Sequence, residues 1–143
     1  MASASGYYIE DLTVGQRETF GKTVTEADIV LYAGISGDTN PMHLNEEYAG
    51  ESMFKGRIAH GMLTASFISA VLGARMPGPG AIYLSQTLKF RAPVRPGDTV
   101  TAVCEVTAID LEKRRVTLKT QCLVKGKPVI DGEAVVMPPS RNG

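Results

Sequence analysis

The chain has 143 residues, which is a usual length for one domain and enough for a sizeable hydrophobic core, so we expect a single domain over 1–143. Fifteen basic and fifteen acidic residues cancel, which gives no electrostatic reason to expect binding to nucleic acid or to an anionic membrane. Cys104 and Cys122 have no other candidate ligands nearby, so we expect buried free thiols rather than a disulfide or a metal site.

The first part of the chain predicts a flexible end, an extended segment, a strand and a helix. Residues 1–6 are small and polar and are expected to fray. Residues 7–14 predict an extended segment, and loose alternation over 16–24 predicts a strand. Thr25, with an acidic residue three positions later, predicts a helix N-cap, and Gly37 is the expected end of that helix.

Residues 37–43, with the sequence Gly-Asp-Thr-Asn-Pro-Met-His, combine a carboxylate and an imidazole with a turn-forming Asn-Pro pair. Pro41 cannot donate to a helical ladder and pushes Asn40 toward extended geometry, so we expect a bent loop. Such a loop can direct Asp38 and His43 at one point. A carboxylate paired with an imidazole can move protons near neutral pH, so these two residues are candidate catalytic groups.

Two further helices are expected before the strands begin. Residues 45–49 can form a short helix, and residues 61–74 predict a longer one that the prolines and glycines at 76–80 end. The segment 61–74 contains no charge, so we expect a central helix that is buried on every side. It is shorter than the roughly 20 residues that span a bilayer, and neither end of the sequence shows a targeting signal. We therefore expect a cytoplasmic protein without membrane contact.

From residue 82 onward the pattern predicts antiparallel strands joined by short turns. The expected strands cover 82–91, 99–109, 116–124 and 129–137. In the second and third of these strands, alternate residues predict matching buried faces, namely Val100, Ala102, Cys104, Val106 and Ala108, and Val116, Leu118, Thr120, Cys122 and Val124. A sheet wrapped around one long helix is the α+β arrangement called the hot-dog fold. One helix covers such a sheet incompletely, so we also expect a homodimer.

Three segments resemble the MaoC-like (R)-specific enoyl-CoA hydratases, and the resemblance covers nearly the whole chain. They are 32–43, which contains the Gly-Asp-x-Asn-Pro-x-His element, 58–63 with His-Gly-Met, and 90–98 with Phe-Arg-Ala-Pro-Val and Gly-Asp. The short type associated with polyhydroxyalkanoate precursors is the closest in size. The resemblance implies a hydro-lyase that hydrates trans-2-enoyl-CoA to (R)-3-hydroxyacyl-CoA. Coenzyme A would then be part of the acyl-CoA substrate, and no cofactor or metal is expected.

The resemblance also assigns roles to individual residues. Asp38 and His43 would hold and activate the attacking water, and the sequence leaves open which of them takes the first proton. The backbone N–H of Gly61, at the start of the buried helix, would stabilise the negative charge on the thioester oxygen. Ser66, on a nearby face of the same helix, would hydrogen-bond within the catalytic group, and Thr64 is the weaker candidate.

Other functions remain as alternatives at this point. The chain could be another hot-dog enzyme, either an acyl-CoA thioesterase or a β-hydroxyacyl dehydratase, although residues 61–74 lack the acid that a thioesterase typically places on this helix. It could also be a non-catalytic acyl-CoA-binding module, which would not need Asp38 and His43 together. His60 is interpreted as bracing the start of the helix rather than as catalytic. The sequence does not predict the acyl chain length or the residues that bind coenzyme A.

Overall fold

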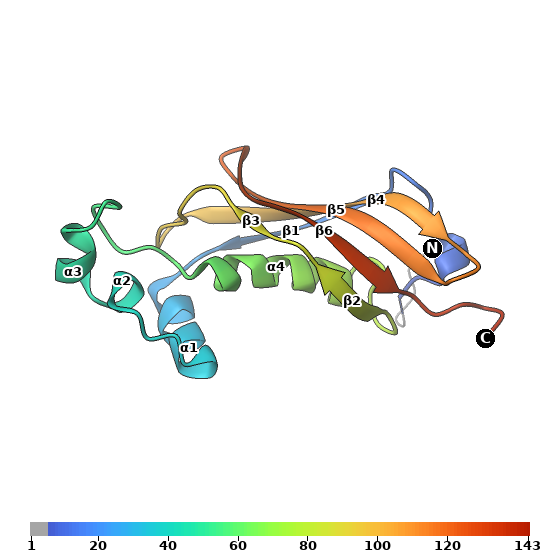
Figure 1. Cartoon of the computed structure of the whole chain (residues 1–143), viewed down its shortest axis with the longest axis horizontal. Helices are drawn as coiled ribbons and strands as arrows, with labels where there is room; N and C mark the ends of the chain where they lie inside the picture. Colours follow the sequence, from blue (N-terminus) through green and yellow to red (C-terminus); the bar gives the residue numbers. More distant parts are fainter. Residues whose placement is uncertain (1–5) are drawn as a thin grey trace.

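A computed structural model describes residues 6–143. One antiparallel sheet of six strands lies over the long helix α4, as Figure 1 shows. The strand order is β1-β4-β5-β6-β2, and the short strand β3 also pairs with β6. The strands are β1 (Arg17–Thr23), β2 (Ile82–Gln86), β3 (Lys89–Phe90), β4 (Thr99–Asp110), β5 (Arg115–Val124) and β6 (Lys127–Met137). The helices are the 3-10 helix η1 (Ile9–Asp11), α1 (Glu26–Ser36), α2 (Pro41–Leu44), α3 (Glu46–Gly50) and α4 (Gly61–Ala74). This is the hot-dog fold that the sequence predicts.

The hairpin of β4 and β5 lies in the middle of the sheet and confirms most of the predicted alternation. Most of the inward-facing residues predicted on these two strands are buried. Ala108 is exposed, contrary to the prediction, because a bulge between Val106 and Ala108 shifts the register against β5. Cys104 and Cys122 are buried free thiols, as predicted.

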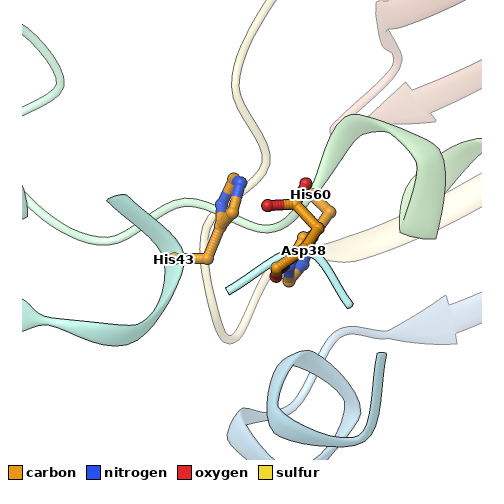
Figure 2. Close-up of side chains that lie close together, drawn as sticks. All are labelled: Asp38, His43 and His60. Atoms are coloured by element: carbon orange, nitrogen blue, oxygen red, sulfur yellow. Dashed lines mark hydrogen bonds between the residues drawn. The ribbon is translucent and has the colours of Figure 1, made fainter. Parts of the chain in front are cut away.

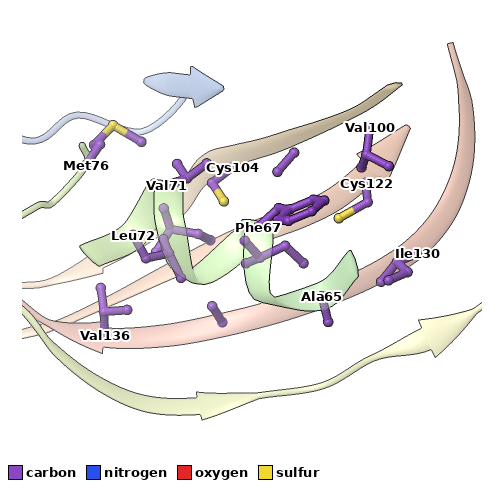
Figure 3. Packing of buried hydrophobic residues seen from close by; sticks show 14 of the residues in the cluster. Ala65, Phe67, Val71, Leu72, Met76, Val100, Cys104, Cys122, Ile130 and Val136 are labelled. Atoms are coloured by element: carbon purple, nitrogen blue, oxygen red, sulfur yellow. The ribbon is translucent and has the colours of Figure 1, made fainter. Parts of the chain in front are cut away.

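Helix α4 packs one side against the sheet. Its buried side chains, among them Phe67 and Ile68, meet the inner face of the strands in the core that Figure 3 shows. On the other side Met62 is 54% exposed and Ser66 is also exposed. The prediction that this helix is buried on every side is therefore wrong for a single chain, because the sheet covers only one side of it.

Helices α1, α2 and α3 lie together at one end of the sheet, near the N-terminus of α4 (Figure 1). Helix α1 begins with the predicted cap, since the Thr25 side chain accepts a hydrogen bond from the Asp28 N–H and the Asp28 carboxylate accepts one from the Thr25 N–H. Gly37 ends the helix in the left-handed conformation, with φ of 80°. Asn45 caps α3, which confirms the predicted short helix.

Two further predictions of local structure are wrong. The extended segment expected over 7–14 contains the 3-10 helix η1. The single strand expected over 82–91 is divided into β2 and β3. The division lies beside Gly132 of β6, where an added Cβ atom would lie only 1.9 Å from the backbone oxygen of Thr87. The chain bends around this close backbone approach, and only glycine permits it.

The predicted flexible end, residues 1–6, is described only at Gly6, and residues 1–5 lie outside the described part of the chain. Gly6 is buried, and an added Cβ atom there would lie 2.6 Å from the carbonyl oxygens of Pro77 and Pro79. This residue therefore packs closely instead of fraying. Within residues 6–143, no helix is both long and apolar enough to cross a membrane.

Candidate active site

A pocket of about 500 Å³ opens at the N-terminal end of α4. Asp38, His43 and Gly61, which the sequence assigns to the site, all line it. Aromatic and aliphatic side chains, including Phe90 of β3, form much of the remaining wall. The structure therefore brings the predicted catalytic pair and the predicted amide to one largely apolar pocket, as binding sites for small molecules usually require.

The loop after α1 positions Asp38 by local hydrogen bonds. The Asp38 N–H donates to the Ser36 hydroxyl over 3.1 Å, and the Asn40 N–H donates to the Asp38 carboxylate over 3.3 Å. The Asn40 side chain then accepts from the Met42 N–H, with Pro41 as the first residue of α2. The predicted bent loop is thus a bend followed by one short helix, because Asn40 caps a helix that Pro41 can begin.

One side-chain contact and one backbone contact hold His43 in place. The residue is 9% exposed, and its Nδ1 lies 2.8 Å from the carbonyl oxygen of Ile58. A carbonyl only accepts, so Nδ1 carries the proton and Nε2 of the neutral ring keeps its lone pair. The backbone oxygen of His43 accepts from Nε of Arg57 over 2.7 Å, and Arg57 also pairs with Glu26 of α1. These contacts leave Nε2 as the nitrogen able to accept a proton.

His60 contacts both candidate catalytic residues, Asp38 and His43. Its Nε2 lies 2.9 Å from the backbone oxygen of Asp38, and its ring stacks on that of His43 with centroids 3.9 Å apart. Figure 2 shows the three side chains close together, and their ligand-type atoms lie within 4.8 Å of one another. His60 is the N-cap residue of α4, but its side chain makes no capping hydrogen bond. Its side-chain contacts are instead with the loop, with His43 and with Tyr32 of α1.

Gly61 begins α4 and lines the pocket. Among the described residues, 6–143, its backbone N–H has no acceptor, as the first amides of a helix lack intrahelical partners. The positive end of the helix dipole lies at the same place and favours negative charge. An added Cβ atom on Gly61 would lie 2.6 Å from Cε1 of Phe90, so the aromatic ring rests directly on this glycine.

Ser66 is not part of the pocket. It is exposed, and its hydroxyl donates to the backbone oxygen of Leu63 over 2.5 Å. Its predicted role in the site stays a prediction without support from these contacts. Thr64, which the sequence ranked lower, lines the pocket, is 1% exposed and has no hydrogen-bond partner for its hydroxyl in the described part of the chain. The sequence also missed Phe90, whose only signal is its place in the Phe-Arg-Ala-Pro-Val segment.

Asp38, His43 and His60 are residue types that can bind a metal ion, and they lie close enough together to do so. An imidazole binds a metal ion in the plane of its ring, through a nitrogen lone pair. The two rings lie face to face with an angle of 29° between their planes, so their in-plane lone pairs lie in two nearly parallel planes and do not converge well on one ion. One nitrogen of each ring already contacts a backbone carbonyl. This geometry suits proton transfer better than metal binding.

Comparisons with known proteins show what this chain is similar to. A family described as "MaoC like domain" matches residues 12–132. An (R)-specific enoyl-CoA hydratase of Rhodospirillum rubrum is 61% identical over 94% of this chain and 94% of its own length. A 3-hydroxybutyryl-CoA dehydratase of Methylorubrum extorquens is 52% identical over 94% of this chain and 85% of its own. The solved (R)-hydratase of A. caviae involved in PHA biosynthesis is 43% identical, has a TM-score of 0.88, and covers 91% of this chain and 99% of that one.

Proposed function

This chain belongs to the MaoC-like domain family, and we propose that it is an (R)-specific enoyl-CoA hydratase. It would add water to a trans-2-enoyl-CoA and release an (R)-3-hydroxyacyl-CoA. The observation that supports the proposal most directly is the meeting of Asp38, His43 and Gly61, whose N–H finds no acceptor within residues 6–143, in one pocket. Similar proteins named (R)-specific enoyl-CoA hydratase, at 61% and 43% identity, support the same reaction.

The proposed reaction begins with a water molecule between Asp38 and His43. The water donates one O–H to the Asp38 carboxylate, and the lone pair on His43 Nε2 removes its other proton. The oxygen then bonds to C3 of the enoyl group, and the π electrons move toward the thioester oxygen. The proton on His43 is finally delivered to C2, so that one water is added across the double bond. General acid-base catalysis of this kind contributes about 10²- to 10⁴-fold in rate.

The Gly61 amide would stabilise the charge that develops on the thioester oxygen. Its N–H is at the positive end of a 14-residue helix, and the apolar wall of the pocket keeps the local dielectric low. Losing one such donor commonly costs about 3 kcal/mol of transition-state stabilisation. No cofactor is needed in this reaction, because coenzyme A is part of the substrate and the charge is stabilised by a backbone group.

The proposal includes a homodimer and a place in metabolism. Four apolar side chains are each more than 40% exposed, which leaves an apolar surface for a second copy. They are Met62 on the open side of α4 and Ile82, Tyr83 and Leu84 of the edge strand β2.

The (R)-3-hydroxyacyl product would link fatty acid β-oxidation to polyhydroxyalkanoate precursors. The cytoplasmic location stays a prediction of the sequence.

The test is hydration of crotonyl-CoA, followed by the loss of the enoyl absorbance and by chiral analysis of the product. An (R)-product from the wild type and little turnover by Asp38→Asn would support the proposal. Release of free coenzyme A would instead indicate a thioesterase. Binding of acyl-CoA without any change in the enoyl absorbance would indicate a non-catalytic module.

A further inference from the structure

We propose that His60 is a positioning residue, which fixes Asp38, His43 and Gly61 relative to one another. The inference rests on the proposed hydration, in which these three residues act on the same substrate. His60 is 2% exposed and lies between the loop after α1 and the first turn of α4. Its side chain would act through its neighbours and would not itself touch the reacting atoms.

The hydrogen bond to Asp38 determines the tautomer of His60. The Asp38 backbone oxygen only accepts, so Nε2 of His60 carries the proton and donates over 2.9 Å. In a neutral ring Nδ1 then keeps its lone pair, and this atom has no partner in the described part of the chain. The bond holds the residue whose carboxylate orients the water, and it spans 22 positions of sequence. No local turn could supply the same restraint.

The His60 ring also restrains His43 by direct packing. It contacts two aromatic neighbours, with centroid distances of 3.9 Å to His43 and 4.8 Å to Tyr32. Because buried side chains are close-packed, a displacement of the His60 ring displaces the ring that supplies the catalytic lone pair. The backbone of His60 leads directly into Gly61, so the same residue also places the amide. One side chain thus ties Asp38 and His43 to the residue that directly precedes Gly61.

Two substitutions separate the hydrogen bond from the ring. His60→Phe keeps an aromatic ring of similar size and removes the N–H, and His60→Gln restores an N–H donor without the ring. We expect His60→Phe to lower kcat about 100-fold with little change in KM, since a misplacement of about 1 Å can cost 10²-fold in rate. His60→Gln should recover to within about 10-fold of the wild type, because the donor to the Asp38 oxygen is present again.

The control for lost stability is Val116→Ala, which removes methyl groups from the buried β5 side of the core and not from the pocket. This variant should lower the melting temperature without lowering kcat. A folded His60→Phe variant with the kcat of the wild type would overturn the proposal. A folded His60→Gln variant as slow as His60→Phe would also overturn it.

A spectroscopic test does not depend on hydratase activity. The chain has only two histidines, so ¹⁵N imidazole NMR gives one ring signal set for each. The wild type should show His60 as the Nε2–H tautomer and His43 as the Nδ1–H tautomer. In His60→Phe the remaining His43 signals should move toward averaged tautomers. Averaged signals for His60 in the wild type, or an unchanged His43 in the variant, would refute positioning. A wild type that shows fixed tautomers and hydrates no enoyl-CoA would refute only the proposed function.

Discussion

Replacing Gly61 distinguishes two reasons for having glycine at this position. One is the close approach of the thioester to its N–H, and the other is the contact with the Phe90 ring. An alanine Cβ would lie 2.6 Å and 2.7 Å from Cε1 and Cδ1 of Phe90, about 1 Å inside ordinary carbon contact distances. The sequence alone predicts that a larger side chain blocks the amide and harms turnover more than stability. The structure adds a steric conflict with the aromatic ring, so both properties should change in Gly61→Ala.

The stability effect can be bounded from the same contact. Overpacking of this kind costs about 1 to 3 kcal/mol, and the gain in helix propensity from glycine to alanine returns up to about 1 kcal/mol. Phe90 is 54% exposed, so the ring can move outward and the cost should be at the low end of the range. Gly61→Ala should therefore lose no more than about 1 kcal/mol of unfolding free energy. In the Phe90→Ala background the same substitution should be neutral or stabilising.

Urea unfolding and crotonyl-CoA hydration of the wild type, the two single variants and the double variant test this reasoning. We expect Gly61→Ala/Phe90→Ala to regain the stability of Phe90→Ala and to remain about 100-fold slower, since the thioester still meets a methyl group beside the amide. A double variant as active as Phe90→Ala would show that the glycine is required by the ring and not by the substrate. The steric part of the oxyanion assignment would then be refuted.

Four other outcomes follow from the structure. Asp38→Asn should keep the melting temperature within a few degrees and lower kcat about 10²- to 10⁴-fold, measured by crotonyl-CoA hydration. Burial raises the pKa of Cys104 and of Cys122 to about 12, so the folded protein should react slowly with thiol reagents and rapidly after unfolding. A hydrogen bond from Lys22 lowers the pKa of Asp28 below its usual 3.8, so this pair stabilises the folded state above about pH 3.8 and loses that effect as the pH falls through the lowered value. The difference in melting temperature between wild type and Asp28→Asn should thus be constant from pH 5 to 8 and shrink below about pH 4. Treatment with EDTA should leave hydration unchanged, and a loss restored by a divalent ion would contradict the proton-transfer interpretation of the histidine cluster.

The parts of the site that sequence could predict are those that local backbone chemistry determines. Gly37 in the left-handed conformation and Asn40 before Pro41 act within a few residues, so they fix the direction of the loop that presents Asp38. The capping box at Thr25 has the same local origin. The bulge at Ala108 depends on pairing between strands, and a single-strand pattern holds no information about it.

Helical spacing alone could not decide between Ser66 and Thr64. The segment is apolar on all sides, so the sequence gives no direction for the face that meets the sheet. In the structure Thr64 faces the pocket and Ser66 faces outward. The sequence could not predict the contact of the Phe90 ring with Gly61 either. The contact joins a strand to a helix nearly thirty residues earlier in the chain.

The roles of the two histidines depend on long-range contacts with backbone oxygens. His43 donates to the oxygen of Ile58, and His60 donates to the oxygen of Asp38. A backbone carbonyl cannot give up or accept a proton near neutral pH, so each contact keeps a proton on the same ring nitrogen at every stage of the reaction. His43 therefore presents a lone pair on Nε2 without an acidic side chain to orient it, which leaves the Asp38 carboxylate available for the water. A site built in this way can use one carboxylate and one imidazole for the whole addition.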